Sequence, residues 1–261
     1  MPRPRFVAIP LLLLAGCVRS DFNLATQHQE YTITSTDKEV ETGRRLALRV
    51  EREMALAADE AMQQRVKDIG ARIAAVCDRR ELVYTFAVVE DKDVNAFSLP
   101  GGYVFLNNAL VKEAATDDEL AGVIAHEVGH IAARHAVKRY ESGLGLQLAT
   151  LATLAARQGE AARGLSVAAQ AAQLAYARQD ELEADRLAVK YMKAAGFDPK
   201  AMLTFLEKLQ QSDQDRSHYL PRGVVRPHYA LTHPYVPERV RGIKEALYGV
   251  ADYIDYLNTP D

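Results

Sequence analysis

Two histidines and a glutamate in the run His126-Glu127-Val128-Gly129-His130 could carry out hydrolytic chemistry. On a helix, residues four positions apart leave the same face, with their Cβ atoms about 6 Å apart. Two imidazoles at that spacing can bind one zinc ion at roughly 2.0–2.1 Å each. A glutamate one position after the first histidine can take a proton from water held beside the ion. The pattern predicts a zinc site with Glu127 as general base.

The flanking residues indicate that this run lies inside an amphipathic helix. Thr116 to Glu119 has the pattern of a capping box, and apolar residues recur at helical spacing from Leu120 to Ile131. Gly129 costs about 1 kcal/mol of helix propensity relative to alanine, so we expect it to let another backbone approach the metal face. The alternative, a surface helix with two solvated histidines, fits this context less well.

A catalytic zinc site needs a third protein ligand and one open position. Glu181 is the best candidate, and it lies in a second helical run, residues 173–195, that ends at Gly196. Asp185 follows four residues later and shares a helix face with Glu181. One of these carboxylates can bind the ion while the other accepts the outer N–H of a liganding histidine.

Two further residues near these motifs are expected to take no part in the site. His135 is the alternative third ligand, but it lies five residues after His130, whereas the related zinc pattern requires six residues and a glycine between. We interpret His135 as a polar residue near the end of the first helix. Glu183 is expected to point away from Glu181 and into solvent.

A strand-rich segment precedes the first helix. Leu82 to Val89 is rich in β-formers, and Asn95, Ala96 and Phe97 form a short extended piece before the turn at Pro100-Gly101-Gly102. A protease can hold an extended peptide by adding it as a strand to a sheet edge. Residues 95–97 are therefore predicted to be the substrate strand; the alternative is a hairpin with a purely structural role.

A long loop after the second helix offers two more histidines. Residues 212–231 contain Pro221, Gly223 and Pro227 and are long enough to act as a lid. His233 could donate to the oxyanion formed during peptide hydrolysis, or it could cover the open zinc position at rest. His228 is the alternative for either role.

Four ordered motifs together carry a family resemblance. They are His126-Glu127-x-x-His130, Glu181-x-x-Ala184-Asp185, Asn95-Ala96-Phe97 with Pro100-Gly101-Gly102, and His233-Pro234 with Arg239. Over residues 40–248 the chain resembles the CAAX-prenyl-protease/HtpX-like branch of the gluzincin metallopeptidases, especially its small periplasmic lipoprotein members.

The resemblance implies an α+β, mainly helical gluzincin fold with a small sheet whose edge strand binds substrate. It implies one Zn²⁺ per chain, with His126, His130 and Glu181 as ligands and Glu127 as the base. Asp185 would support a ligand from behind, and His233 and Arg239 would lie near the oxyanion or cap the site.

The N-terminus predicts export and lipid anchoring. Arg3 and Arg5 precede an apolar stretch that ends in the lipobox-like Leu14-Ala15-Gly16-Cys17. We expect a signal peptide over residues 1–16, a lipidated Cys17, a polar tether over 17–38, a metallopeptidase domain over 39–250 and a tail over 251–261. Val18 after the cysteine indicates the outer membrane, facing the periplasm; the alternative is an ordinary cleaved signal.

The composition sets further limits. A formal net charge of −3 gives no basic surface for nucleic acid. Cys77, on an apolar helical run, is expected to be an inert core residue. Residues 144–175 are rich in alanine, leucine and glutamine and are expected to form a helical hairpin between the two metal-binding helices. The alternative is insertion into a membrane, which polar residues such as Arg157, Glu160 and Arg163 disfavour.

The sequence thus predicts a membrane-anchored zinc endopeptidase of the bacterial envelope that degrades misfolded or misassembled envelope proteins. The alternative is a chaperone or assembly factor for outer-membrane proteins, which would work with the outer-membrane assembly machinery and keep its protease site mostly latent.

Overall fold

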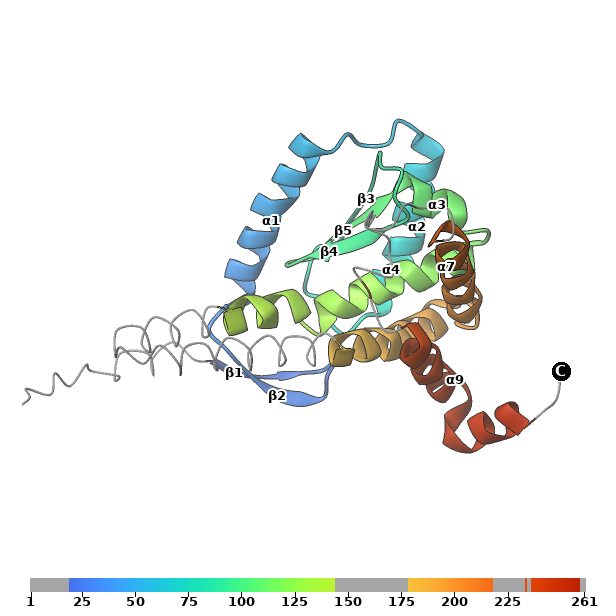
Figure 1. Ribbon diagram of the computed structural model, residues 1–261. Coiled ribbons are helices and arrows are strands. Elements are labelled where there is room, and N and C mark those ends of the chain that lie inside the picture. The colour runs from blue at the N-terminus through green and yellow to red at the C-terminus, as the bar shows by residue number, and fades with distance from the viewer. Residues whose placement is uncertain (1–18, 144–177, 218–232, 234–235, 259–261) are drawn as a thin grey trace, which may run out of the picture.

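The structure is a computed structural model that describes residues 19–143, 178–217, 233 and 236–258. It is mainly helical, with two small sheets (Figure 1). The larger sheet contains β3 (Thr85–Val89), β4 (Ala96–Leu99) and β5 (Tyr103–Asn107) in the order β3-β5-β4. β5 pairs in parallel with β3 and antiparallel with β4, so β4 is an outer strand. The predicted α+β, mainly helical class is confirmed.

Helix α4 (Asp117–Ala132) is the centre of the core, and every residue from Glu119 to Ala132 is buried. It packs against α2 (Glu60–Val76) and against β4 and β5. The predicted cap is confirmed, because the Thr116 hydroxyl accepts a hydrogen bond from the Glu119 N–H at 3.1 Å. The Glu119 carboxylate in turn accepts from the Ala115 N–H at 2.7 Å. A helix surrounded in this way by apolar neighbours is held rigidly.

Helix α1 (Thr36–Glu53) packs against the end of β4, and α3 (Asn108–Glu113) follows β5 directly. The contact of α1 requires a glycine, because a Cβ at Gly43 would lie 1.7 Å from the Pro100 carbonyl oxygen. The turn after Pro100 also depends on glycine, since Gly101 and Gly102 have φ values of 79° and 107°. The predicted Pro-Gly-Gly turn is therefore confirmed.

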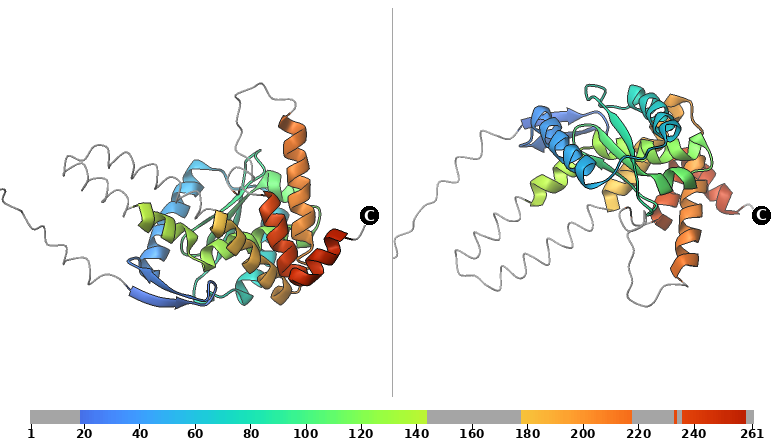
Figure 2. Two further views of the ribbon diagram at one scale, coloured as in Figure 1. Left: turned by 60° about the horizontal axis from the view of Figure 1, so that its bottom comes forward. Right: turned by 90° about the horizontal axis from the view of Figure 1, so that it is seen from above.

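The C-terminal half supplies residues 178–195, which are helical, followed by α7 (Ala201–Ser217) and α9 (Val236–Asn258). Helix α7 packs on the N-terminal half of α4, and α9 packs on α7 (Figures 1 and 2). Gly196, at φ 76°, ends the 178–195 helix as predicted. Residues 212–217 were expected in the long loop but belong to α7. Helix α9 is interrupted at Gly249, beside the expected domain boundary.

The polar tether expected over residues 17–38 is wrong for residues 19–32. These residues form an antiparallel hairpin of β1 (Arg19–Asn23) and β2 (His28–Thr32). The Asn23 amide donates to the Ala132 carbonyl at the end of α4 at 3.2 Å. The Thr32 hydroxyl donates to Glu141, in the helical segment 135–143, at 2.6 Å. The hairpin presents polar side chains to the body of the protein, so its strands lack the usual apolar alternation.

Several expectations concern residues outside the described part of the chain, namely the signal peptide, Cys17, the 144–175 hairpin and His228. Cys77 is 1% exposed in the core, and burial raises the pKa of its thiol, as expected for an inert residue. Among the helices described, none combines the length and apolar character needed to cross a bilayer.

Candidate metal centre

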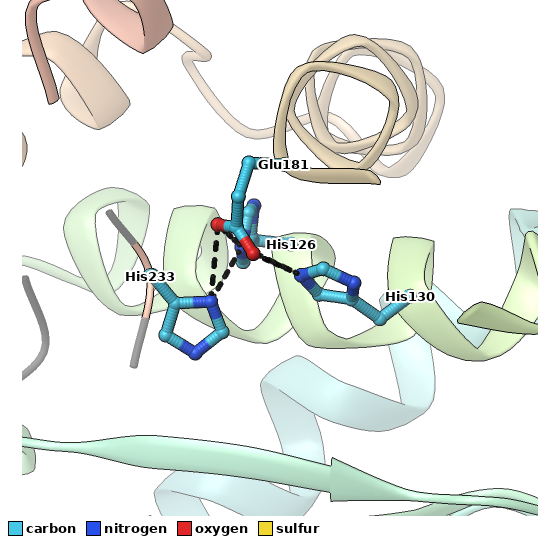
Figure 3. A group of neighbouring side chains, drawn as sticks. All are labelled: His126, His130, Glu181 and His233. Atoms are coloured by element: carbon cyan, nitrogen blue, oxygen red, sulfur yellow. Dashed lines mark hydrogen bonds and ion pairs between the residues drawn. The ribbon is translucent and has the colours of Figure 1, made fainter. Parts of the chain in front are cut away.

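Four buried side chains from three parts of the chain converge at one point (Figure 3). His126 and His130 leave the same face of α4, and their Nε2 atoms are 3.1 Å apart. Glu181 reaches them from the 178–195 helix, with Oε2 3.3 Å from His126 Nε2 and Oε1 3.4 Å from His130 Nε2. The Nδ1 atom of His233 lies 3.1 Å from Glu181 Oε2 and 3.3 Å from His126 Nε2.

The donor atoms fit a zinc ion. Ligands at 2.0–2.1 Å in a tetrahedron lie about 3.3–3.4 Å from one another. The two histidine Nε2 atoms are 3.1 Å apart, and the Glu181 oxygens lie 3.3 and 3.4 Å from them. These distances are close to the edges of such a tetrahedron. Imidazole nitrogens repel at such distances unless a proton or a cation lies between them. The residues present therefore suit one divalent ion, as the sequence predicted from His126, His130 and Glu181.

Gly129 allows the two ligand-bearing helices to approach each other. A Cβ at this position would lie 2.9 Å from the Ala184 carbonyl oxygen and 3.2 Å from the Ala184 Cα. Both are backbone atoms of the 178–195 helix and cannot rotate away. The close approach that the sequence predicted for Gly129 is thus present, and the neighbour is the segment that carries Glu181.

Gly129→Ala is therefore expected to push Glu181 away from the two histidines. Overpacking of this kind costs about 1–3 kcal/mol of folding free energy, more than the roughly 1 kcal/mol gained in helix propensity. Zinc affinity, measured by titration against a chelator, should fall together with the stability to urea. Gly143→Ala is the control, because no described atom lies within 4 Å of its added Cβ. Equal zinc affinity in the two variants would contradict this role.

Asp185 supports His126 from behind. Its Oδ1 lies 2.8 Å from His126 Nδ1, the ring nitrogen that faces away from the cluster. Arg239, 1% exposed, donates to both oxygens of the Asp185 carboxylate at 2.8 Å. Burial and the Arg239 charge lower the pKa of His126, but Asp185 and Glu181 outweigh them and raise it to about 9. Arg239 Nη1 also donates to the His233 carbonyl oxygen at 3.4 Å, so Arg239 links Asp185 to the segment that carries His233.

Glu181 is held in its ionised form. Burial raises the pKa of this carboxyl, but hydrogen bonds from His126 and His233 dominate and hold it well below its usual range. Arg239 Nη1 adds a positive charge 3.5 Å from Oε2. An ionised carboxylate is the form that can bind a cation, so the surroundings of Glu181 favour metal binding.

His135 and Glu183 differ from their predictions. Both were expected to take no part in the site, but α4 ends at Ala132 and Arg134 adopts a left-handed φ of 59°. This break turns His135 back, so that its Nδ1 lies 2.8 Å from His130 Nδ1. His135 Nε2 lies 3.3 Å from the Glu183 carboxylate, which therefore faces His135 and not open solvent. His135 is itself only 1% exposed.

Asp180 also belongs to this neighbourhood, and the sequence did not single it out. Its Oδ1 is 3.5 Å from His135 Nε2. A signal was available, because Asp180 and Glu183 are three residues apart and share one helix face, distinct from the face of Glu181 and Asp185. Glu181 contacts both histidines of α4, whereas Asp180 and Glu183 contact His135.

Glu127 lies beside the cluster, with its carboxylate 1% exposed. Its Oε1 forms no hydrogen bond of good geometry with a described residue, and His233 Nε2 lies 3.3 Å from it. A buried carboxylate oxygen without a hydrogen bond is costly. Such an atom suits a site that receives water or substrate during a reaction.

A cleft of about 190 Å³ runs between α4 and the outer strand β4. Its walls include Phe97 of β4, the neighbouring Pro100, and Glu127, His130 and His233 of the cluster. Ala96 and Phe97 lie in β4, and Asn95 directly precedes the strand, with its carbonyl accepting from the Asn107 N–H at 2.9 Å. The predicted substrate strand thus borders the cleft that contains Glu127.

Comparison with known proteins gives a family match and several relatives. The model of "Peptidase family M48" matches residues 60–247. The "Beta-barrel assembly-enhancing protease" of Yersinia pestis is 30% identical over 216 residues, covering 79% of this chain and 43% of the relative. The protein of the same name from Escherichia coli strain K12 is 30% identical over 193 residues, covering 70% of this chain and 38% of the relative.

A mitochondrial relative is similar to the same extent. The "Mitochondrial metalloendopeptidase OMA1" of Schizosaccharomyces pombe is 32% identical over 178 residues, covering 67% of this chain and 50% of the relative. The chain spans half or less of the length of these relatives. The family match contains the whole of α4 and the segment with Glu181 and Asp185, and it confirms the gluzincin resemblance. The chain belongs to peptidase family M48.

Proposed function

We propose that this protein is a zinc-dependent endopeptidase. The observation that carries the proposal is the convergence of His126, His130 and Glu181 at mutual donor distances of 3.1–3.4 Å, with the Glu127 carboxylate beside them in the same cleft. Catalytic zinc sites have three permanent protein ligands, whereas structural sites are closed by four. His126, His130 and Glu181 would be the three, and His233 lies near the fourth position. The named activity of the family M48 relatives supports the same reading.

In the proposed mechanism, His126, His130 and Glu181 would hold the ion. When bound, zinc supplies a Lewis acid that acidifies water and polarises the carbonyl group of a peptide. Glu127 takes a proton from the attacking water and later delivers it to the amine nitrogen that leaves. Asp185, fixed by Arg239, holds the ring of His126 so that its Nε2 faces the cluster.

The outer strand β4 would bind the substrate. A peptide added along this strand would pair its backbone with β4 and pass Glu127 in the cleft. Backbone pairing gives little selectivity for the side chains of the substrate, and it requires the substrate to be extended. The proposed substrates are therefore unfolded or misassembled proteins.

We infer an envelope location from two sources. Relatives named for β-barrel assembly support a role near outer-membrane proteins. The lipobox-like residues before Cys17 support a lipid anchor, because several acyl chains hold a protein at a membrane far more firmly than one. The proposed task is degradation of misassembled envelope proteins at the periplasmic face of the outer membrane.

The proposed activity is tested by incubating the purified chain with casein, an unfolded protein substrate. Cleavage is expected with zinc, should stop when a chelator removes the ion and should return when zinc is added back. Magnesium should not replace zinc, since it prefers oxygen ligands in an octahedron. Cleavage that persists in the chelator would contradict the proposal. So would a failure of both the wild type and the His233→Ala variant to cleave casein when they are loaded with zinc.

His233 is proposed to cover the fourth zinc position in the resting protein. Its Nδ1 lies among the ligand atoms, and its Nε2 lies 3.3 Å from Glu127 Oε1, where it would block access of water to the base. His233→Ala should therefore raise casein cleavage by about tenfold, which corresponds to a closed state favoured by about 1.4 kcal/mol. A loss of about a hundredfold would instead identify His233 as an oxyanion donor. His28→Ala, on the exposed strand β2, is the control.

A second candidate function, an assembly factor for outer-membrane proteins, is favoured by the same position of His233. If His233 covers the zinc position for most of the time, an unfolded protein bound along β4 would usually dissociate without being cut. In that case the wild-type protein should slow aggregation of an unfolded β-barrel protein without cleaving it. Glu127→Gln should retain this holding activity, because binding along β4 does not need the base.

A further inference from the structure

The outer ring nitrogens of the two α4 histidines are supported in different ways. His126 Nδ1 contacts a carboxylate directly, at 2.8 Å from Asp185. His130 Nδ1 instead contacts a second imidazole, at 2.8 Å from His135 Nδ1. The far nitrogen of that imidazole, His135 Nε2, faces Glu183 at 3.3 Å and Asp180 at 3.5 Å. A chain of contacts thus links His130 to two carboxylates through His135.

The positions of the protons along this chain follow from its ends. An ionised carboxylate only accepts hydrogen bonds, so His135 Nε2, which faces Asp180 and Glu183, carries a proton. A neutral imidazole has one proton, which leaves His135 Nδ1 as an acceptor. His130 Nδ1 must then be the donor across the 2.8 Å contact. With its proton on Nδ1, His130 has a free lone pair on Nε2, the atom 3.4 Å from Glu181 Oε1.

The fold forces this contact by breaking the helix. In a continuous helix, residue 135 would lie about 140° around the axis from residue 130 and could not meet its ring. The left-handed conformation of Arg134 redirects the chain, at a cost of about 1–2 kcal/mol for a residue with a side chain. Arg134 is held there by Glu39, whose Oε2 is 3.0 Å from its Nε, and by the Thr34 carbonyl at 2.7 Å.

We propose that His135 is a positioning residue that fixes the ring orientation and tautomer of His130, acting as a relay between His130 and the carboxylates of Asp180 and Glu183. The proposal rests on the zinc site of the proposed function and adds to it His135, which would not be a ligand of the ion. All three acidic residues involved, Asp180, Glu181 and Glu183, lie on one helix. That helix therefore contacts His130 directly through Glu181 and indirectly through His135.

The first test measures zinc affinity by competition with a chelator. His135→Leu removes the acceptor and should weaken zinc binding by about 10–100-fold. His135→Asn keeps an oxygen near the position of Nδ1 and should recover part of that loss. If His135 only filled space, His135→Leu should instead bind zinc more tightly than His135→Asn. Equal zinc affinity of His135→Leu and the wild type would overturn the proposal.

The second test observes the protons directly, by ¹⁵N NMR of histidine-labelled, zinc-loaded protein. The signals of residue 135 are identified by their loss in His135→Asn. We expect a protonated Nδ1 at His130, with a bare Nδ1 and a protonated Nε2 at His135. A proton on His135 Nδ1 would overturn the relay even if zinc affinity changed.

If His135→Leu fails to fold, the double variant Asp180→Asn/Glu183→Gln replaces it. These carboxylates are partly exposed, with side-chain exposures of 14% and 27%, so their loss leaves the core intact. Zinc affinity should fall several-fold, and the exposed Glu207→Gln on α7 should leave it unchanged. Unchanged affinity in the double variant would again overturn the proposal. A wild-type protein that binds no zinc would refute the proposed function itself, which separates the two failures.

Discussion

Replacing Glu127 with glutamine is expected to lower casein cleavage by about 10²–10⁴-fold while zinc binding stays unchanged. Glutamine has nearly the shape of glutamate but cannot take a proton from water at neutral pH. The side chain is 1% exposed and lies in the cleft beside the donor cluster without contributing a ligand atom. The substitution therefore removes the proposed base and leaves His126, His130 and Glu181 in place.

Cleavage should be measured as kcat/KM on casein in the His233→Ala background, so that any covering of the site by His233 does not mask the effect. Zinc content is measured on the same samples. Glu207→Gln, an exposed change of the same chemistry on α7, should cleave at the parent rate. If Glu127→Gln cleaved casein at the parent rate with zinc retained, another residue would have to be the base.

Arg239→Met is expected to cost about 3–5 kcal/mol of folding free energy. Arg239 is 1% exposed and forms two hydrogen bonds of 2.8 Å with Asp185, so its loss leaves a buried carboxylate without its main partner. Methionine fills much of the same volume, and the loss therefore reports on charge and hydrogen bonding more than on a cavity. Zinc affinity should fall too, since Asp185 holds His126.

Urea unfolding in the presence of a chelator measures this cost without any contribution from bound metal. Arg241→Met is the control, because Arg241 lies two residues further along α9 and is exposed. That variant should stay within about 0.5 kcal/mol of the wild type. If Arg239→Met were as stable as Arg241→Met, the Asp185–Arg239 pair would not support the site.

The parts of the site that follow a helical repeat could be predicted from the sequence. His126 and His130, like Glu181 and Asp185, are four residues apart, so one backbone geometry fixes each pair on a common face. Gly129 and Gly196 were informative because glycine is costly inside a helix, so its presence needs a close contact or a helix end to explain it. The Pro-Gly-Gly turn was predicted for a comparable reason, since few residues tolerate that turn.

The parts that depend on a break in regular structure could not be predicted. The end of α4 at Ala132 and the left-handed Arg134 have no glycine or proline to mark them. They are stabilised by contacts from distant residues, Glu39 and the Thr34 carbonyl, which no local pattern contains. The contact of His135 with His130 was therefore not predicted, and neither was the contact of Glu183 with His135.

The β1–β2 hairpin was missed for a different reason. Its strands contain no apolar alternation, because the polar side chains of Asn23 and Thr32 make its contacts with the body of the protein. Sequence periodicity indicates the burial of apolar side chains. A strand pair that is held by hydrogen bonds of polar side chains has no alternating apolar pattern.

The central claim is that one zinc ion is held jointly by α4 and by the 178–195 helix. Anomalous diffraction at the zinc absorption edge, from crystals of the zinc-loaded protein, tests it most directly. The account predicts one peak per chain, within about 2.0–2.2 Å of His126 Nε2, His130 Nε2 and a Glu181 carboxylate oxygen, and no such peak for Glu181→Ala. A peak at any other position, or an undiminished peak in Glu181→Ala, would contradict it.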